Sequence, residues 1–231
     1  MNKNVKVIAS MTAAAVFALG TAYSVAGGKG TNVGEDKKAS AATAVSQLAL
    51  AAELVAYGDK NKDAMALILA AKIQMQNPTR EGKQKKTSKG GGKDDKKSGK
   101  ADSTDAVLAR ARALAKGDKG MLAMVDDVAD MTSRGRTKGA VSGHRDRVLA
   151  RSTDSYKLKF DGGRLAEILI KGDHDTDLDL YVYDENNHEI CKDTDSTDTM
   201  YCKWTPRWTG TFTIKIKNLG SISNIYTLAT N

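Results

Sequence analysis

The last third of the sequence alternates apolar and polar residues with a period of two, and this pattern constrains the fold most. Residues 211–217 read Thr-Phe-Thr-Ile-Lys-Ile-Lys without an error, and residues 156–160 alternate in the same way. Such alternation is typical of strands with one buried face, because successive side chains point to opposite faces of a sheet. Further short apolar segments, separated by Asp, Asn and Gly turn residues, lie at 165–170, 178–183 and 226–229. Several short strands with no helical segment between them predict an antiparallel β-sandwich over residues 151–231.

A helical period marks the residues before this region. In residues 40–77, apolar residues recur every three or four positions on both sides of a break at Gly58-Asp59-Lys60-Asn61. Residues 102–133 repeat the arrangement around Gly117-Asp118-Lys119. The two segments predict two helical hairpins, which form a small four-helix bundle, a degenerate tetratricopeptide-like repeat or two unrelated units. The fold class is therefore a multidomain one, with an α part followed by an all-β part.

A Lys/Gly-rich segment at residues 78–101 separates the two hairpins. Residues 80–100 contain nine basic and three acidic residues, a net charge of +6, and no large apolar side chain. Because such a segment cannot bury enough surface to offset its ordering entropy, it predicts a disordered linker. The alternative is contact with an anionic surface through counterion release. Specific nucleic-acid binding is not expected, because no aromatic residue is present to stack on a base. Residues 134–150 predict a connector.

The first 26 residues have the layout of a secretory signal peptide. Lys3 and Lys6 precede a short apolar run at residues 7–19, and Ser24-Val25-Ala26 places small residues before a cleavage site at Gly27. The run is shorter than the roughly 20 residues that a membrane-spanning helix needs, which disfavours an anchor. We therefore expect a periplasmic or secreted protein with no transmembrane segment after cleavage, and a flexible N-terminus at residues 27–39.

Export bears on the expected state of the two cysteines. Cys191 and Cys202 are the only cysteines in the chain. In an oxidising compartment such a pair predicts one disulfide that closes a short loop, whereas a redox-active pair is more often Cys-x-x-Cys. Trp204 and Trp208 flank Thr-Pro-Arg just after this loop. They predict core or edge packing, with contact to a sugar ligand as the alternative.

An acidic run includes Cys191 and ends shortly before Cys202. From Asp173 to Asp198 there are ten acidic residues and Lys192 as the only lysine or arginine. In an extended segment Asp175, Asp177 and Asp179 lie on one face, where they repel one another unless a cation lies between them. Calcium accepts six to eight oxygen ligands in flexible geometry, so these three residues predict a calcium site. The alternative is a solvated acidic edge that discourages aggregation between strands.

Enzyme chemistry is not expected. The sequence lacks the Gly-x-x-x-x-Gly-Lys-Ser/Thr, His-Glu-x-x-His and Gly-x-Ser-x-Gly patterns. Two cysteines and three scattered histidines leave little material for a zinc site. A carboxylate pair can hydrolyse a glycoside, but a sandwich of this size has little room for a substrate cleft.

A resemblance to a known family covers about the last 80 residues. The residues that carry it are Gly172-Asp-His-Asp-Thr-Asp-Leu-Asp-Leu-Tyr-Val-Tyr, then Trp208-Thr-Gly-Thr-Phe-Thr-Ile, then Asn224-Ile-Tyr-Thr-Leu. This order resembles the bacterial pre-peptidase C-terminal domain, a jelly-roll-like β-sandwich appended to secreted proteases and other exported proteins. The resemblance implies a binding or stabilising module, and calcium binding in some relatives supports the predicted site. One departure is that no peptidase domain accompanies the module here.

These observations together predict an exported, non-enzymatic accessory module. Its expected partner is an exported protein or a cell-envelope polysaccharide, and calcium is the expected cofactor. The alternative is a chaperone-like or protective domain for a partner exported protein.

Overall fold

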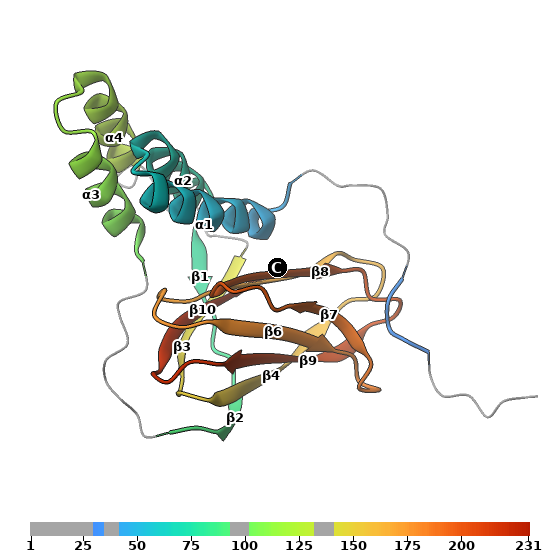
Figure 1. The fold of residues 1–231 in the computed structure, drawn as a ribbon. Helices are drawn as coiled ribbons and strands as arrows, with labels where there is room; N and C mark the ends of the chain where they lie inside the picture. The colour runs from blue at the N-terminus through green and yellow to red at the C-terminus, as the bar shows by residue number, and fades with distance from the viewer. Residues whose placement is uncertain (1–29, 35–41, 93–101, 132–140) are drawn as a thin grey trace, which may run out of the picture. The chain divides into compact units, whose positions relative to one another are not determined.

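The computed structural model describes residues 30–34, 42–92, 102–131 and 141–231, and within them it contains four helices and two five-stranded sheets (Figure 1). The helices are α1 (Ala44–Asn61), α2 (Ala64–Gln76), α3 (Thr104–Leu114) and α4 (Lys119–Met131). The strands are β1 (Thr79–Glu81), β2 (Lys86–Gly90), β3 (Val141–Val148), β4 (Ser152–Phe160), β5 (Ala166–Lys171), β6 (Leu178–Tyr183), β7 (Glu189–Asp193), β8 (Thr199–Trp204), β9 (Gly210–Asn218) and β10 (Asn224–Thr230). The predicted combination of helices and a β-sandwich is confirmed at this level. The proposed signal peptide and its cleavage site lie outside the described residues.

Capping side chains begin all four helices, and for α4 the Asp118 carboxylate accepts a hydrogen bond from the backbone N–H of Met121. The hydroxyl of Thr43 accepts a hydrogen bond from the backbone N–H of Ser46, and the carboxylate of Asp63 accepts two such bonds at the start of α2. Ser103 does the same for α3. Each cap satisfies backbone donors that have no partner inside the helix.

The break expected at Gly58-Asp59-Lys60-Asn61 lies a few residues later, because α1 continues to Asn61 and α2 begins at Ala64. A Cβ at Gly58 would lie 2.7 Å from Leu67 Cδ2, so the glycine instead allows α2 to pack closely against α1. Gly117, by contrast, lies between α3 and α4 with a positive φ of 95°, as expected for a turn.

The four helices share one apolar core. Its buried members are Ala51, Val55, Leu67, Ile68, Ala70, Ala71, Val107, Leu108, Ala111, Val125 and Val128, which come from all four helices. Arg110 of α3 donates hydrogen bonds to Asp59 at 2.9 Å and to both carboxylate oxygens of Asp102 at 2.8 Å. The two hairpins therefore form a single helical unit.

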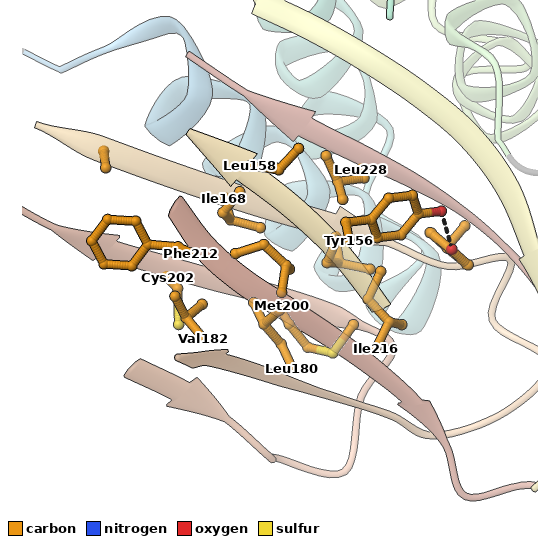
Figure 2. Close-up of a cluster of buried hydrophobic side chains, with 14 of the residues drawn as sticks. Tyr156, Leu158, Ile168, Leu180, Val182, Met200, Cys202, Phe212, Ile216 and Leu228 are labelled. Atoms are coloured by element: carbon orange, nitrogen blue, oxygen red, sulfur yellow. Dashed lines mark hydrogen bonds between the residues drawn. The ribbon is translucent and has the colours of Figure 1, made fainter. Parts of the chain in front are cut away.

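The strands form two sheets that face each other across a second apolar core. The order is β1-β3-β10-β5-β8 in one sheet and β2-β4-β9-β6-β7 in the other. All neighbours are antiparallel except β1 and β3. Figure 2 shows core side chains from both sheets, among them Leu180, Val182, Phe212 and Ile216 from one sheet and Ile168, Met200 and Leu228 from the other. The alternating residues of β9 supply the apolar face that the sequence predicted.

Two boundary predictions are wrong. Within residues 78–92, where a disordered linker was expected, β1 pairs with β3 and β2 pairs with β4, so this segment adds one edge strand to each sheet. Its strands bury few apolar side chains, and backbone pairing at the sheet edge stabilises them instead. Within the expected connector at 134–150, residues 141–148 form β3.

Helix α1 packs on the sheet that contains β10. Val45 and Ala49 of α1 form a small buried cluster with Val141, Leu169 and Ala229 from that sheet. The hydroxyl of Thr43 also donates a 2.7 Å hydrogen bond to Glu167 Oε1. This contact places the exposed side of α1 beside the loops that carry the acidic run.

Candidate functional site

A pocket of about 580 Å³ lies between α1 and two loops of the sandwich. Helix α1 contributes one wall, the loop before β6 a second, and the segment from β7 to β8 a third. The lining residues are Ala49, Ala52, Glu53 and Ala56 from α1, His174, Asp175, Thr176 and Asp177 from the loop, and Asp193, Asp195, Ser196, Thr197, Asp198, Thr199 and Tyr201 from the β7–β8 segment. We call this feature the acidic pocket.

Carboxylates dominate the lining of the acidic pocket. Six acidic residues line it, and no Lys or Arg of the described chain does. The α1 wall differs, since three of its four lining residues are alanines. The pocket therefore combines a small apolar wall with a strongly negative one.

Asp177 has a buried carboxylate oxygen in the acidic pocket. Its Oδ1 is buried and accepts no hydrogen bond from the part of the chain that the structure describes. Burial, followed by the negative charges of Asp179, Asp195 and Asp198, raises the pKa of the Asp177 carboxyl. A positive group entering the pocket would relieve this repulsion.

His174 and Asp198 anchor the base of the pocket. His174 Nδ1 lies 3.1 Å from Asp198 Oδ1, and the backbone N–H of His174 donates to the same carboxylate. The hydrogen bond to Asp198 raises the pKa of His174. Burial alone would raise the pKa of the Asp198 carboxyl, but its interactions, first the hydrogen bond from His174, leave that pKa lowered. Gly172 is required here, because a Cβ at that position would lie 2.2 Å from Asp198 Oδ2.

The structure places the three residues of the predicted calcium site on two elements. Asp175 and Asp177 line the acidic pocket, whereas Asp179 lies on β6, is only 5% exposed and accepts a 3.2 Å hydrogen bond from the Tyr181 hydroxyl. Lys217 of β9 is directly opposite Asp179 in the sheet. Among the described residues, no group of three or more His, Cys, Asp or Glu side chains is arranged to hold a metal ion.

A disulfide between Cys191 and Cys202 supports the β7–β8 wall of the pocket. Cys191 belongs to β7, at the edge of one sheet, and Cys202 belongs to β8, at the edge of the other. The bond therefore joins the two sheets on either side of the connection that carries Asp193 to Thr199.

Neither tryptophan lines the acidic pocket. Trp204 is 3% exposed and contacts Phe160 and Phe212 edge-on or tilted, so it is a core residue and not a surface ligand contact. Trp208 is half-buried, and its Nε1–H donates a 2.5 Å hydrogen bond to Glu185 Oε1.

Sequence reasoning identified the acidic loops but missed the α1 wall. Glu53 and the three alanines belong to the first hairpin, and no local pattern indicates that they face the acidic run. It also missed Asn32, which is fully buried and bonded to Asp184, Glu185 and Trp208.

No protein-family model matches the chain, and no curated protein matches it. Several solved structures are similar to part of it. The pre-peptidase C-terminal domain of a Bacillus anthracis collagenase aligns with 39% of this chain and 88% of its own, at 9% identity and a TM-score of 0.33. A periplasmic inhibitor of g-type lysozyme from Aeromonas hydrophila aligns with 39% of this chain and 84% of its own, at 14% identity and a TM-score of 0.31. The Yersinia pseudotuberculosis-derived mitogen aligns over the same shares, at 16% identity and a TM-score of 0.28. Similarities of this size carry no functional argument, so function is argued below from the residues of the pocket.

Proposed function

We propose that this protein is an exported, non-catalytic binding module that holds a lysine- or arginine-bearing segment of a partner protein in the acidic pocket. The observation that carries the proposal is the lining of the pocket. Among the described residues, this lining contains six carboxylates and three alanines of α1 but no Lys or Arg.

The two walls of the pocket complement the two ends of a basic side chain. Lys and Arg have a long aliphatic stem and a charged head, and they commonly bury the stem against apolar surface. The alanines of α1 offer that surface, and Asp177 and its neighbours offer charge-assisted hydrogen bonds to the head. An anionic polysaccharide would be repelled from the same lining. A protein partner is therefore the better fit of the two expected classes.

Two further proposals concern the setting of the module. We propose that the protein acts in the periplasm or outside the cell, which the Cys191–Cys202 disulfide supports, since such bonds persist in oxidising compartments.

We also propose that the sandwich is a jelly-roll-like pre-peptidase C-terminal domain. The Asp-Leu-Asp-Leu-Tyr residues at the start of β6 and the Gly-Thr-Phe-Thr-Ile residues of β9 support this proposal. Among the described residues, no helix is long and apolar enough to cross a membrane.

Calcium binding at Asp175, Asp177 and Asp179 stays a prediction. Burial and the neighbouring negative charges, which together raise the pKa of the Asp177 carboxyl, support it, and the position of Asp179 on β6 does not. Melting of the protein with calcium and with a chelator tests it, because a ligand selective for the folded state raises the melting temperature.

The binding proposal is tested by titrating the mature protein with short oligo-lysine and oligo-arginine peptides in a calorimeter. A peptide of acetylated lysines is the matched probe without charge. The double variant Glu53→Gln/Asp177→Asn removes two pocket charges, and Asp127→Asn/Asp161→Asn removes two exposed charges elsewhere.

We expect basic peptides to bind the wild type and the acetylated peptide not to bind. Affinity should fall about tenfold in the pocket variant, the effect of losing two partly exposed charge contacts. The control variant should lose much less. Equal losses in both variants would assign the binding to net charge, and binding of the acetylated peptide would point to the chaperone-like alternative.

A further inference from the structure

Lys86 connects two aspartates that come from different sheets. Its Nζ lies 2.7 Å from Asp146 Oδ1 and 2.9 Å from Asp154 Oδ2. Lys86 begins β2 at the edge of one sheet, Asp154 lies on the neighbouring strand β4, and Asp146 lies on β3 of the other sheet. One amine therefore contacts two carboxyl groups at once.

Aromatic and hydroxyl groups enclose this contact. Asp154 is 1% exposed, and both Tyr156 and Tyr226 are fully buried. The Tyr226 hydroxyl donates a 2.9 Å hydrogen bond to Asp154 Oδ2, and Ser88 Oγ donates a 2.6 Å hydrogen bond to Asp154 Oδ1. The Tyr156 hydroxyl is hydrogen-bonded to that of Tyr226 and lies 3.4 Å from Asp146 Oδ2, and Figure 2 draws the bond at the Tyr156 hydroxyl. Bulk water has little access to the Asp154 carboxyl.

Such surroundings favour chemistry between an amine and a carboxyl group. A neutral lysine amine is a nucleophile, and holding it against its electrophile replaces a bimolecular collision by an intramolecular step.

We propose that Lys86 and Asp154 condense to an intramolecular amide, a covalent cross-link between β2 and β4. The step forms a bond between Lys86 Nζ and Asp154 Cγ, breaks the bond from Cγ to one carboxyl oxygen and releases one water molecule. Nothing is oxidised or reduced. The ammonium and the carboxylate together supply the two hydrogens and the oxygen of that water.

Asp146 is placed to move the protons. Its Oδ1 accepts a hydrogen bond from Lys86 Nζ, so it can take the proton that the Lys86 ammonium loses before the amine attacks and give it to the departing oxygen. The second proton of the released water also comes from Nζ. Burial alone would raise the pKa of the Asp146 carboxyl, but the hydrogen bond from Lys86 lowers it, so Asp146 is held as the carboxylate that this task requires. The Tyr226 hydroxyl stabilises the charge that develops on the Asp154 oxygen.

The cross-link would fix β2, and with it the Lys/Gly-rich segment, to the sandwich. β2 pairs only with β4 and buries few side chains, so it is an edge strand that could otherwise detach. An amide at Lys86 would hold this edge closed in the exported protein, where no other covalent bond joins β2 to the sandwich among the described residues.

Intact mass spectrometry of the reduced, denatured mature protein tests the proposal. We expect a mass lower than that of the sequence by one water molecule, and a branched tryptic peptide that joins the Lys86 and Asp154 segments. Lys86→Met, Asp154→Ala and Asp146→Ala should each restore the full mass. Lys89→Met, an exposed lysine on the same strand, should leave the water loss unchanged.

The wild-type mass decides the question even where a variant fails to fold. A full, undiminished mass would show that Lys86 makes only ion pairs and would overturn the proposal. A water loss that maps to any other residues would overturn it as well.

Discussion

Asn32 is fully buried although it lies far from the sandwich in the sequence. Its side-chain nitrogen donates to the Trp208 carbonyl at 3.1 Å, and its side-chain oxygen accepts from the Trp208 backbone N–H at 3.0 Å. Asn32→Ala leaves both Trp208 backbone groups without this partner, so we expect a loss of about 2 kcal/mol in the free energy of unfolding. Urea denaturation checks this, with Thr31→Ala at the exposed neighbouring position as the control. Equal stability of the two variants would contradict it.

His174 makes stability depend on pH at the acidic pocket. Because its hydrogen bond to Asp198 raises its pKa in the folded protein, the protonated form is stabilising. This contribution is complete below the ordinary histidine pKa of about 6.5 and is lost as the pH rises through the raised value. His174→Asn, which tolerates the positive φ of 69° at this position, should therefore cost about 0.5 kcal/mol more at about pH 5.5 than at about pH 9.

Thermal melts of the wild type and the His174 variant at both pH values give the comparison. A difference that is the same at both values would show that the side chain acts through shape and not through its charge.

At the scale of elements, strands with an alternating pattern could be predicted and strands without one could not. β4 and β9 each present an apolar face to the core, and the period of two reveals this directly. β1, β2 and β3 are polar along most of their length. Their strand conformation depends on backbone pairing with partners distant in sequence, and no local pattern encodes such pairing.

The pocket likewise has one part that the sequence pattern predicts and one part that it does not. Its acidic loops are one continuous run, so their charge was visible in the sequence. The α1 wall was not, because the small residues that line it are spaced like those of any helix packed on a neighbour. The Asp175/Asp177/Asp179 alternation also assumed a single extended strand, whereas β6 begins only at Leu178.

The Cys191–Cys202 bond is the covalent support of the β7–β8 wall of the pocket, and it joins the edges of both sheets. The bond restricts the unfolded chain by closing a loop, so reduction should lower the free energy of unfolding by about 3 kcal/mol. Urea titrations with and without a reductant measure the change. In Cys191→Ser/Cys202→Ser the reductant should have no effect, and an equal effect in that variant would assign the loss to some other cause.

At the scale of the whole molecule, the helical unit and the sandwich are interleaved along the chain. The segment that joins the two hairpins carries β1 and β2, and these strands lie at the edges of the two sheets. The part of the Lys/Gly-rich segment that the structure describes therefore belongs to the sandwich and is not only a spacer. Lys86 of this segment contacts the buried Asp154. Residues 151–231 do not contain the complete sheets, although they contain most of the apolar core.

This interleaving predicts that the C-terminal residues alone fold poorly. A chain of residues 141–231 lacks β1 and β2, so β3 and β4 become open edges and Asp154 loses Lys86. Ion-paired or amide-linked, Lys86 is the partner of the buried Asp154 carboxyl, and losing the partner of a buried charge costs about 3–5 kcal/mol. We therefore expect the truncated chain to melt well below the mature protein and to self-associate.

A synthetic peptide of residues 78–92 isolates the role of the two strands, because the truncated chain also lacks α1 and Asn32. Added in trans, this peptide should raise the melting temperature and reduce self-association, whereas a peptide of the same composition in scrambled order should do neither. Lys86→Met in the peptide should remove most of the rescue, since the ammonium that pairs with Asp154 is then missing. If the truncated chain melts with the mature protein, or if the scrambled peptide rescues it equally, the two edge strands contribute nothing specific to the sandwich.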